Sequence, residues 1–192
     1  MPSTAVLIPV KAFGQAKRRL ADVLDAAARA DLARSMATTV VRAAGSLPVV
    51  VVCDDDEVRE WGEALGVEVL WAAGLGLNGA VNAGTEHIAA AGVDRVIVAH
   101  ADLPLATDLG WVAAGVGVTL VPDRHADGTN VACVPTGTGF TFAYGAGSFA
   151  RHQAEAERLG LALRIVTDVR LGWDVDRPED LDLPLVGEVP CR

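Results

Sequence analysis

The sequence predicts an α/β protein built around an open, parallel sheet, on the strength of three observations. Short Val-rich runs alternate with segments whose apolar residues recur at helical spacing. The composition is 51% hydrophobic but only 5% aromatic, which is typical of helices and strands packed through Ala, Val and Leu. The length of 192 residues suits one core, so we expect a single domain over residues 1–192.

The first strand is expected at residues 5–10, and the loop after it is strongly basic. The chain has only two lysines, Lys11 and Lys17, and both lie in this loop beside Arg18 and Arg19. Four of the 16 basic residues therefore fall within nine positions. A flexible cationic loop after a central strand suits a polyphosphate, although a solvated basic turn is the simpler alternative. We interpret the loop as an anion-binding site.

The remaining elements follow from the same two signals: short apolar runs predict strands, and apolar residues at helical spacing predict helices. Strands are expected at 48–53, 67–70, 95 onward, 118–121, 130–134, 140–144 and 163–166. Helices are expected at 25–44, around 58–65, at 107–116 and from 148 to 159. The acidic run at 54–56 precedes the second helix and is interpreted as capping.

Two acidic segments are candidates for metal binding. The buried run that starts at Arg95 stops on Asp102, and ligands of open parallel sheets gather beyond the carboxyl ends of strands. The alternative is that Asp102 only caps the following turn. Near the C-terminus, Asp176 could be an N-cap before Pro178, but Asp174 is harder to explain in that way. We therefore expect Asp174 to be the partner carboxylate of Asp102.

The glycines at 74, 76 and 79 satisfy the G-x-G-x-x-G pattern of dinucleotide-binding proteins. They follow the third expected strand, whereas that fingerprint usually follows the first one, with an acidic residue at a characteristic distance. We interpret Gly74–Gly79 as a loop approaching a nucleotide base, in which Asn78 offers an amide to a base edge. A plain flexible loop and a nicotinamide or flavin site are the alternatives.

Two further loops carry donors for an anionic small molecule. The loop at 122–130 contains Arg124 and His125, and begins where a strand ends, although its Asp-Gly-Thr-Asn segment is also ordinary turn chemistry. In the second loop, Gly145 and Gly147 precede Ser148, the expected N-cap of a helix. The backbone N–H groups there would form an anion site at the positive helix end, although capping alone would explain the serine.

Charge and targeting signals exclude other classes of protein. The formal charge of −9 argues against a general nucleic-acid surface. Apolar runs stay well short of the roughly 20 residues that span a bilayer, and the start lacks a signal-peptide pattern, so we expect a cytoplasmic protein. Cys53, Cys133 and Cys191 are too far apart to predict a disulfide framework or a zinc site.

Taken together, the motifs resemble one known family. They are Pro9-Val10-Lys11, Ala16-Lys17-Arg18-Arg19-Leu20, Gly76-Leu77-Asn78, Ala101-Asp102-Leu103-Pro104, Pro122-Asp123-Arg124-His125, Asp127-Gly128-Thr129-Asn130, Gly147-Ser148, Arg151-His152 and Asp174-Val175-Asp176. In this order, over residues 5–183, they resemble the 2-phospholactate/phosphoenolpyruvate guanylyltransferases of coenzyme F-420 biosynthesis. The chain departs from the family pattern at Arg177, where threonine is usual, and at Ala146, where proline is frequent.

The resemblance implies a three-layer α/β/α nucleotidyltransferase fold, GT-A-like and Rossmann-like, with a mixed, mostly parallel sheet. It implies that GTP donates GMP to phosphoenolpyruvate, or to 2-phospho-L-lactate, with Mg²⁺ as cofactor. The product would be handed to the next enzyme of the pathway. The resemblance also implies acceptor contacts at Thr129, Gly145 and Ser148. Combined with the residues singled out above, the expected sites are catalytic contacts at Lys11, Lys17 and Arg18; further acceptor contacts at Arg124 and His125; nucleotide contacts at Gly76, Asn78 and Lys17; and metal ligands at Asp102, Asp174 and Asp176. Because the attacking phosphate is already anionic, the reaction needs no general base.

Two other classes of function stay open on the sequence. An oxidoreductase using Gly74–Gly79 would bind a nicotinamide or flavin cofactor and release no pyrophosphate. A nucleotide-binding module without turnover would follow if Arg177 disturbed the metal site.

Overall fold

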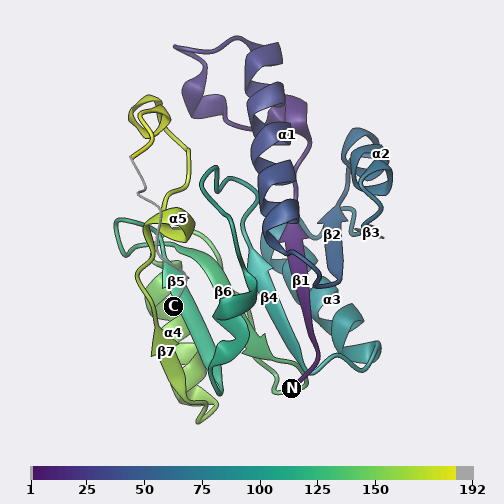
Figure 1. Cartoon of the computed structure of the whole chain (residues 1–192), viewed down its shortest axis with the longest axis vertical. Helices are drawn as coiled ribbons and strands as arrows, with labels where there is room; N and C mark the ends of the chain where they lie inside the picture. The colour runs from purple at the N-terminus through teal and green to yellow at the C-terminus, as the bar shows by residue number, and fades with distance from the viewer. Residues whose placement is uncertain (1, 185–192) are drawn as a thin grey trace.

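The computed structural model describes residues 2–184, and Cys191 lies outside this range. Its centre is one seven-stranded sheet in the order β3-β2-β1-β4-β6-β5-β7 (Figure 1). The strands are β1 (Thr4–Pro9), β2 (Val49–Cys53), β3 (Glu68–Trp71), β4 (Arg95–Ala99), β5 (Val118–Pro122), β6 (Thr129–Pro135) and β7 (Leu163–Ile165). Only β6 runs antiparallel to its neighbours, β4 and β5, within this sheet. The expected mixed, mostly parallel sheet is confirmed.

Alternate side chains of the central strands enter two separate cores, one on each face of the sheet. In β1, Val6 and Ile8 pack with residues of α1 (Ala26–Ala43) and α2 (Asp56–Ala64). The intervening Leu7 packs on the other face with residues of α3 (Gly76–Ala90) and α4 (Ser148–Arg158). Strands apolar on both faces are what a sheet covered on both sides requires, and the three layers follow from that pattern.

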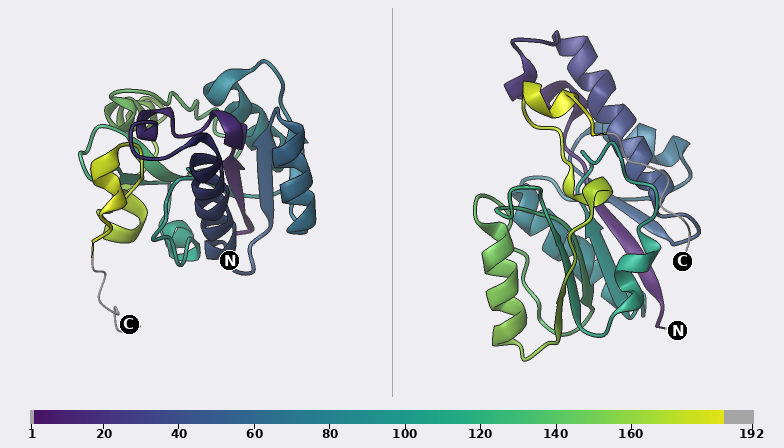
Figure 2. Two further views of the ribbon diagram at one scale, coloured as in Figure 1. Left: turned by 90° about the horizontal axis from the view of Figure 1, so that it is seen from above. Right: turned by 60° about the vertical axis from the view of Figure 1, so that its left-hand side comes forward.

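One edge of the sheet collects the loops that matter for function. β1, β4 and β5 end at this edge, and β6 begins at it because β6 is antiparallel to β4 and β5. The segment after α5 (Val169–Gly172) returns to the same edge and lies against the first loop (Figure 2, right). There Leu20, Met36 and Val175 form a small third apolar cluster.

Two expected elements are wrong. The helix expected at 107–116 is only a 3₁₀ turn, Gly110–Ala114. The strand expected at 140–144 does not pair with the sheet in the described chain, because side chains take the place of a neighbouring strand. Asn82 exchanges two hydrogen bonds with the backbone of Phe142, at 3.0 and 3.4 Å, and Asn78 does the same with Tyr144, at 2.6 and 3.3 Å. An apolar alternating pattern predicts an extended segment but not its partner.

Within residues 2–184, no helix is both long enough and apolar enough to cross a bilayer.

Candidate functional site

Three carboxylates from two distant segments meet at the functional edge of the sheet. Asp102 lies three residues beyond the end of β4, and Asp174 and Asp176 lie in the segment that follows α5. One ligand oxygen from each lies within 4.8 Å of the other two. The backbone joins the segments as well, since Val175 N–H donates to the Asp102 carbonyl at 3.2 Å. The predicted meeting of residues 102 and 174 is therefore present in the structure.

Buried polar contacts hold the second acidic segment in place. The carboxylate of Asp180 accepts the backbone N–H groups of Asp176 and Arg177, at 2.7 and 2.8 Å. Arg124 forms an ion pair with Asp180, and its guanidinium also donates to the Asp174 carbonyl at 3.3 Å. Arg124 is predicted to contact the acceptor, and in the structure it also braces residues 174–180.

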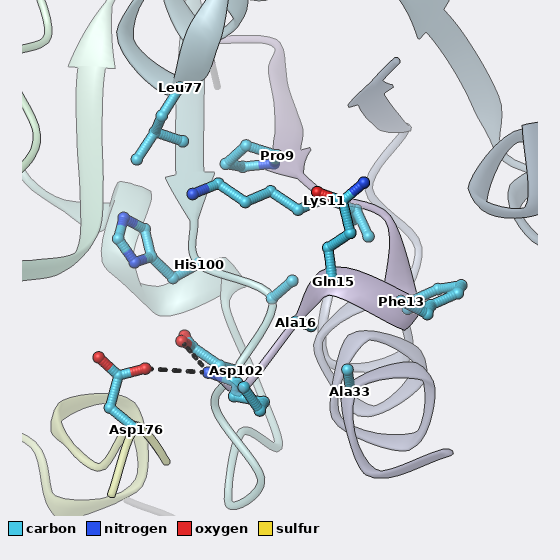
Figure 3. Close-up of a pocket in the computed structure, with 13 residues that line it drawn as sticks. Pro9, Lys11, Phe13, Gln15, Ala16, Ala33, Leu77, His100, Asp102 and Asp176 are labelled. Carbon is cyan, nitrogen blue, oxygen red and sulfur yellow. Dashed lines mark hydrogen bonds and ion pairs between the residues drawn. The ribbon is translucent and has the colours of Figure 1, made fainter. Parts of the chain in front are cut away.

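The Lys17 ammonium lies in contact with this carboxylate cluster. Its Nζ is 2.7 Å from Asp102 Oδ2 and 3.2 Å from Asp176 Oδ1, the two ion pairs drawn as dashed lines in Figure 3. The lysine backbone has a φ of 53°, in the left-handed region that non-glycine residues rarely adopt. Such backbone strain persists where the surrounding structure requires it. Here the strained backbone places the Lys17 side chain against Asp102 and Asp176.

Burial and neighbouring charges set the protonation of the cluster. Burial works against the charge of Lys17, but Asp102 and Asp176 raise its pKa above the usual value. Burial also works against ionised Asp102, yet Lys17 lowers the pKa of that carboxyl overall. The pKa of Asp174 is raised, first by burial and then by the negative charge of Asp102. Asp174 therefore carries electrostatic strain that a cation would relieve.

These residues fit a hard divalent cation. Carboxylate oxygens are the ligands that such ions prefer, and three of them converge here. Asp102 Oδ1 is buried and has no hydrogen-bond partner among residues 2–184. Asn130 fixes the neighbouring ligand, since its amide donates to Asp174 Oδ1 at 3.4 Å and to the Leu171 carbonyl at 3.1 Å.

Three adjoining cavities lie along this edge of the sheet, and two of them reach the carboxylate cluster. A central cavity of about 330 Å³ lies over the end of β1 (Figure 3). A second one of about 460 Å³ extends toward the end of β2, and we call it the β2 cavity. A third one of about 630 Å³ lies at the start of β6, and we call it the β6 cavity. The central cavity shares Lys11 and Leu77 with the β2 cavity, and His100, Asp102 and Asp176 with the β6 cavity.

The structure distributes the predicted contacts along this groove. All five predicted acceptor residues line the β6 cavity: Thr129, Gly145, Ser148, Arg124 and His125. The basic residues line the other side: Lys11 and Lys17 the central cavity, and Lys11 and Arg18 the β2 cavity. The carboxylate cluster lies between the two sets.

Two local interpretations need correction. Residues 76–79 are not a loop but the first turn of α3, and both polar atoms of the Asn78 amide bond the backbone of Tyr144. Ser148 is not the N-cap of α4, because Gly147 takes that position. The N–H groups of residues 147, 148 and 149 already donate to Asp127 Oδ1, the Gly145 carbonyl and the Asp127 carbonyl, so the expected backbone anion site is occupied by the protein itself.

Four contributors were assigned no individual role from the sequence: Asn130, Asp180, His152 and Asn82. Each acts through a contact with a residue distant in sequence, from 23 positions away for His152 to 60 for Asn82. Such pairings depend on topology, which local spacing does not encode.

Comparisons with known proteins agree on the fold and on the family. The family described as "Guanylyl transferase CofC like" matches residues 4–188. A phosphoenolpyruvate guanylyltransferase of Sphaerobacter thermophilus is 36% identical, over 98% of this chain and 95% of its own length. A 2-phospho-L-lactate guanylyltransferase of Methanocaldococcus sp. is 30% identical, over 92% and 78%. The structure of a nucleotidyl transferase from Methanothermobacter thermautotrophicus superimposes with a TM-score of 0.66 at 17% identity, covering 94% of each chain.

Proposed function

Because the chain belongs to the CofC-like guanylyl transferase family, we propose that it transfers GMP from GTP to the phosphate of phosphoenolpyruvate, releasing pyrophosphate. A phosphate oxygen of the acceptor forms a bond to the α-phosphorus of GTP while the bond from that phosphorus to the β-phosphate oxygen breaks. The products are enolpyruvyl-diphospho-guanosine and pyrophosphate. The reaction is a step of coenzyme F-420 biosynthesis. Cytoplasmic location and hand-off of the product stay predictions.

The observation that carries this proposal is the carboxylate cluster at the junction of the central cavity and the β6 cavity. On the side of the central cavity, Lys11 and Arg18 offer positive charge to a triphosphate, and Leu77 and Ala80 of the adjoining β2 cavity offer apolar surface to a flat base. On the other side, the β6 cavity offers hydroxyl groups at Thr129 and Ser148. A donor that extends from the β2 cavity through the central cavity would meet an acceptor in the β6 cavity over Asp102, which is what an in-line transfer requires.

Asp102, Asp174 and Asp176 would hold Mg²⁺, the divalent ion that nucleotide phosphates usually bring to such sites. When bound, the ion neutralises phosphate charge that develops during the transfer. Lys17 already contacts two of these carboxylates, so its ammonium is positioned to pair with a phosphate oxygen beside them. An anionic acceptor needs no base, and the residues have chiefly to position the substrates and balance their charge.

The test is a pyrophosphate-release assay that crosses the four nucleoside triphosphates with phosphoenolpyruvate, 2-phospho-L-lactate and 3-phosphoglycerate, each with and without Mg²⁺. We expect release with GTP and phosphoenolpyruvate that depends on the metal. Release with 2-phospho-L-lactate alone would transfer the proposal to that acceptor. No release with any pair would refute a guanylyltransferase.

A further inference from the structure

A fully buried histidine connects the wall of the β6 cavity to the loop behind it. His152 lies in α4, and its Nδ1 is 3.0 Å from the hydroxyl oxygen of Thr129, the first residue of β6. Its Nε2 is 3.0 Å from the backbone nitrogen of Ala143. The ring is packed against those of Phe142 and Tyr144, with centroid distances of 5.7 and 4.9 Å. The imidazole is therefore held by both of its nitrogens and by the aromatic rings beside it.

The partners of the ring determine which nitrogen carries the proton. The backbone N–H of Ala143 can only donate, so His152 Nε2 must be an acceptor without hydrogen. A neutral imidazole with an unprotonated Nε2 has its hydrogen on Nδ1, where it donates to Thr129 Oγ1. Burial, and then the positive charge of Arg151, lower the pKa of His152 to about 4. The ring is thus neutral around pH 7.

The Thr129 hydroxyl can then act only as a donor toward any further partner. Its oxygen accepts from His152, and its own hydrogen has no acceptor among residues 2–184. The Thr129 N–H meanwhile donates to Ser148 Oγ at 3.1 Å, so the serine oxygen is also an acceptor and keeps its hydrogen for another partner. Both residues are almost completely buried, yet both line the β6 cavity. Two hydroxyl hydrogens are therefore available to a ligand there.

We propose that His152 is a positioning residue that fixes the Thr129 hydroxyl as a hydrogen-bond donor to an anionic oxygen of the acceptor in the β6 cavity. The inference rests on the proposed function, which places the acceptor in this cavity, and it extends that function to a residue behind the cavity wall. His152 acts on the acceptor only through Thr129. Without it, the hydroxyl could rotate, and its hydrogen could turn away from the ligand.

The first test compares steady-state kinetics of His152→Phe, Thr129→Val and the double variant. Phenylalanine keeps a ring in the apolar pocket but removes both hydrogen bonds. Because a hydrogen bond to a charged group is worth about tenfold or more, we expect Thr129→Val to raise the KM for phosphoenolpyruvate about tenfold and His152→Phe about fivefold. The KM for GTP should change less than about twofold in each. In the Thr129→Val background, His152→Phe should have almost no further effect on the acceptor KM.

The matched control is Asn82→Leu. Asn82 holds the same loop through the backbone of Phe142, so its loss loosens that loop but leaves Thr129 and His152 in contact. A purely structural role of His152 predicts that Asn82→Leu and His152→Phe raise the acceptor KM alike. A positioning role predicts a change with His152→Phe only. Equal changes, or additive changes in the double variant, would overturn the proposal.

A measurement on the wild-type protein does not depend on the variants folding. Nitrogen-15 NMR of the histidine rings should show His152 with hydrogen on Nδ1 and none on Nε2 between pH 6 and pH 8. Hydrogen on Nε2 would overturn the inference directly. Failure of the wild type to release pyrophosphate from GTP with any acceptor would instead refute the proposed function, so the two failures are distinguishable.

Discussion

Replacement of Asp102 by asparagine separates the function of the carboxylate cluster from the stability of the fold. The substitution removes one of three converging negative charges but keeps the shape of the side chain. Loss of one preorganised charge contact commonly costs about 10²- to 10³-fold in turnover. We therefore expect Asp102→Asn to lower pyrophosphate release at least about 100-fold at saturating GTP and phosphoenolpyruvate.

The stability of Asp102→Asn should differ little from that of the wild type, because Lys17 keeps other contacts. The side chains of Lys17 and Asp102 are only 9% and 21% exposed, so removal of one charge would be costly if the other were left unpaired. After the substitution, however, Lys17 keeps Asp176 at 3.2 Å, the amide oxygen still accepts from the ammonium, and repulsion of Asp174 by Asp102 disappears. We expect the free energy of unfolding to change by about 1 kcal/mol, the difference between a charged and a neutral acceptor of the same hydrogen bond. For this chain length that is a Tm shift of about 2–4 °C at most.

The assay measures pyrophosphate release over a series of Mg²⁺ concentrations, beside thermal unfolding of the same samples. Asp56→Asn is the control. Asp56 is an exposed residue of α2, and its ion pair with Arg59, also on α2, involves no residue of the carboxylate cluster. Wild-type turnover by Asp102→Asn at high Mg²⁺ would refute the assignment of Asp102 as an essential ligand. A large fall in Tm with proportional loss of activity would refute the separation of the two effects.

Three further predictions follow from other contacts. Lys17→Met should lower kcat/KM for GTP at least about tenfold, because a phosphate loses its ammonium partner, and unchanged kinetics would return Lys17 to a structural role. Asn78→Leu should cost about 2 kcal/mol in urea unfolding, the sum of two hydrogen bonds to Tyr144, and should leave the preference for GTP over ATP intact; loss of that preference would restore Asn78 as the base-reading residue. The pKa of His152 is lowered from 6.5 to about 4, so the unfolded chain binds a proton below pH 6.5 that the folded protein does not. Stability should therefore fall as the pH drops from 6.5 to 4, by up to about 3 kcal/mol, and this component should be missing from urea titrations of His152→Phe.

The central strands could be predicted from the sequence because their evidence is local. The runs of β1, β2 and β4 are apolar at every position except the first residues of β1 and β4, Thr4 and Arg95, and an element buried on both faces needs such a run whatever its neighbours are. The order of the strands and the reversal of β6 do not follow from such runs. The family resemblance indicated a mixed sheet, whereas the residues alone indicated a parallel one.

Site residues could be predicted where charged side chains stand out in the sequence. They could not be predicted where their role depends on a contact with a residue distant in sequence. Asp102 stands out because a buried apolar run stops on it, and Asp174 stands out because, unlike Asp176, it is hard to explain as an N-cap. Arg124 also stands out as a cation in a polar loop, but its partner, Asp180, is 56 residues away, and this pairing makes it a brace. The amide of Asn78 was assigned to a base for the same reason, since its actual partner is 66 residues distant.

The reversed strand β6 has a consequence for how relatives can diverge. Because β6 starts where its neighbours stop, a single stretch from residue 123 to 148 supplies most of the β6 cavity, while the β2 cavity is built mainly from residues 9–18, 52–55 and 72–80. Substitutions within that one stretch can therefore reshape the proposed acceptor pocket without touching the residues that we propose to face GTP. Guanylyltransferases for phosphoenolpyruvate and for 2-phospho-L-lactate could thus arise from one ancestor by changes within residues 123–148 alone.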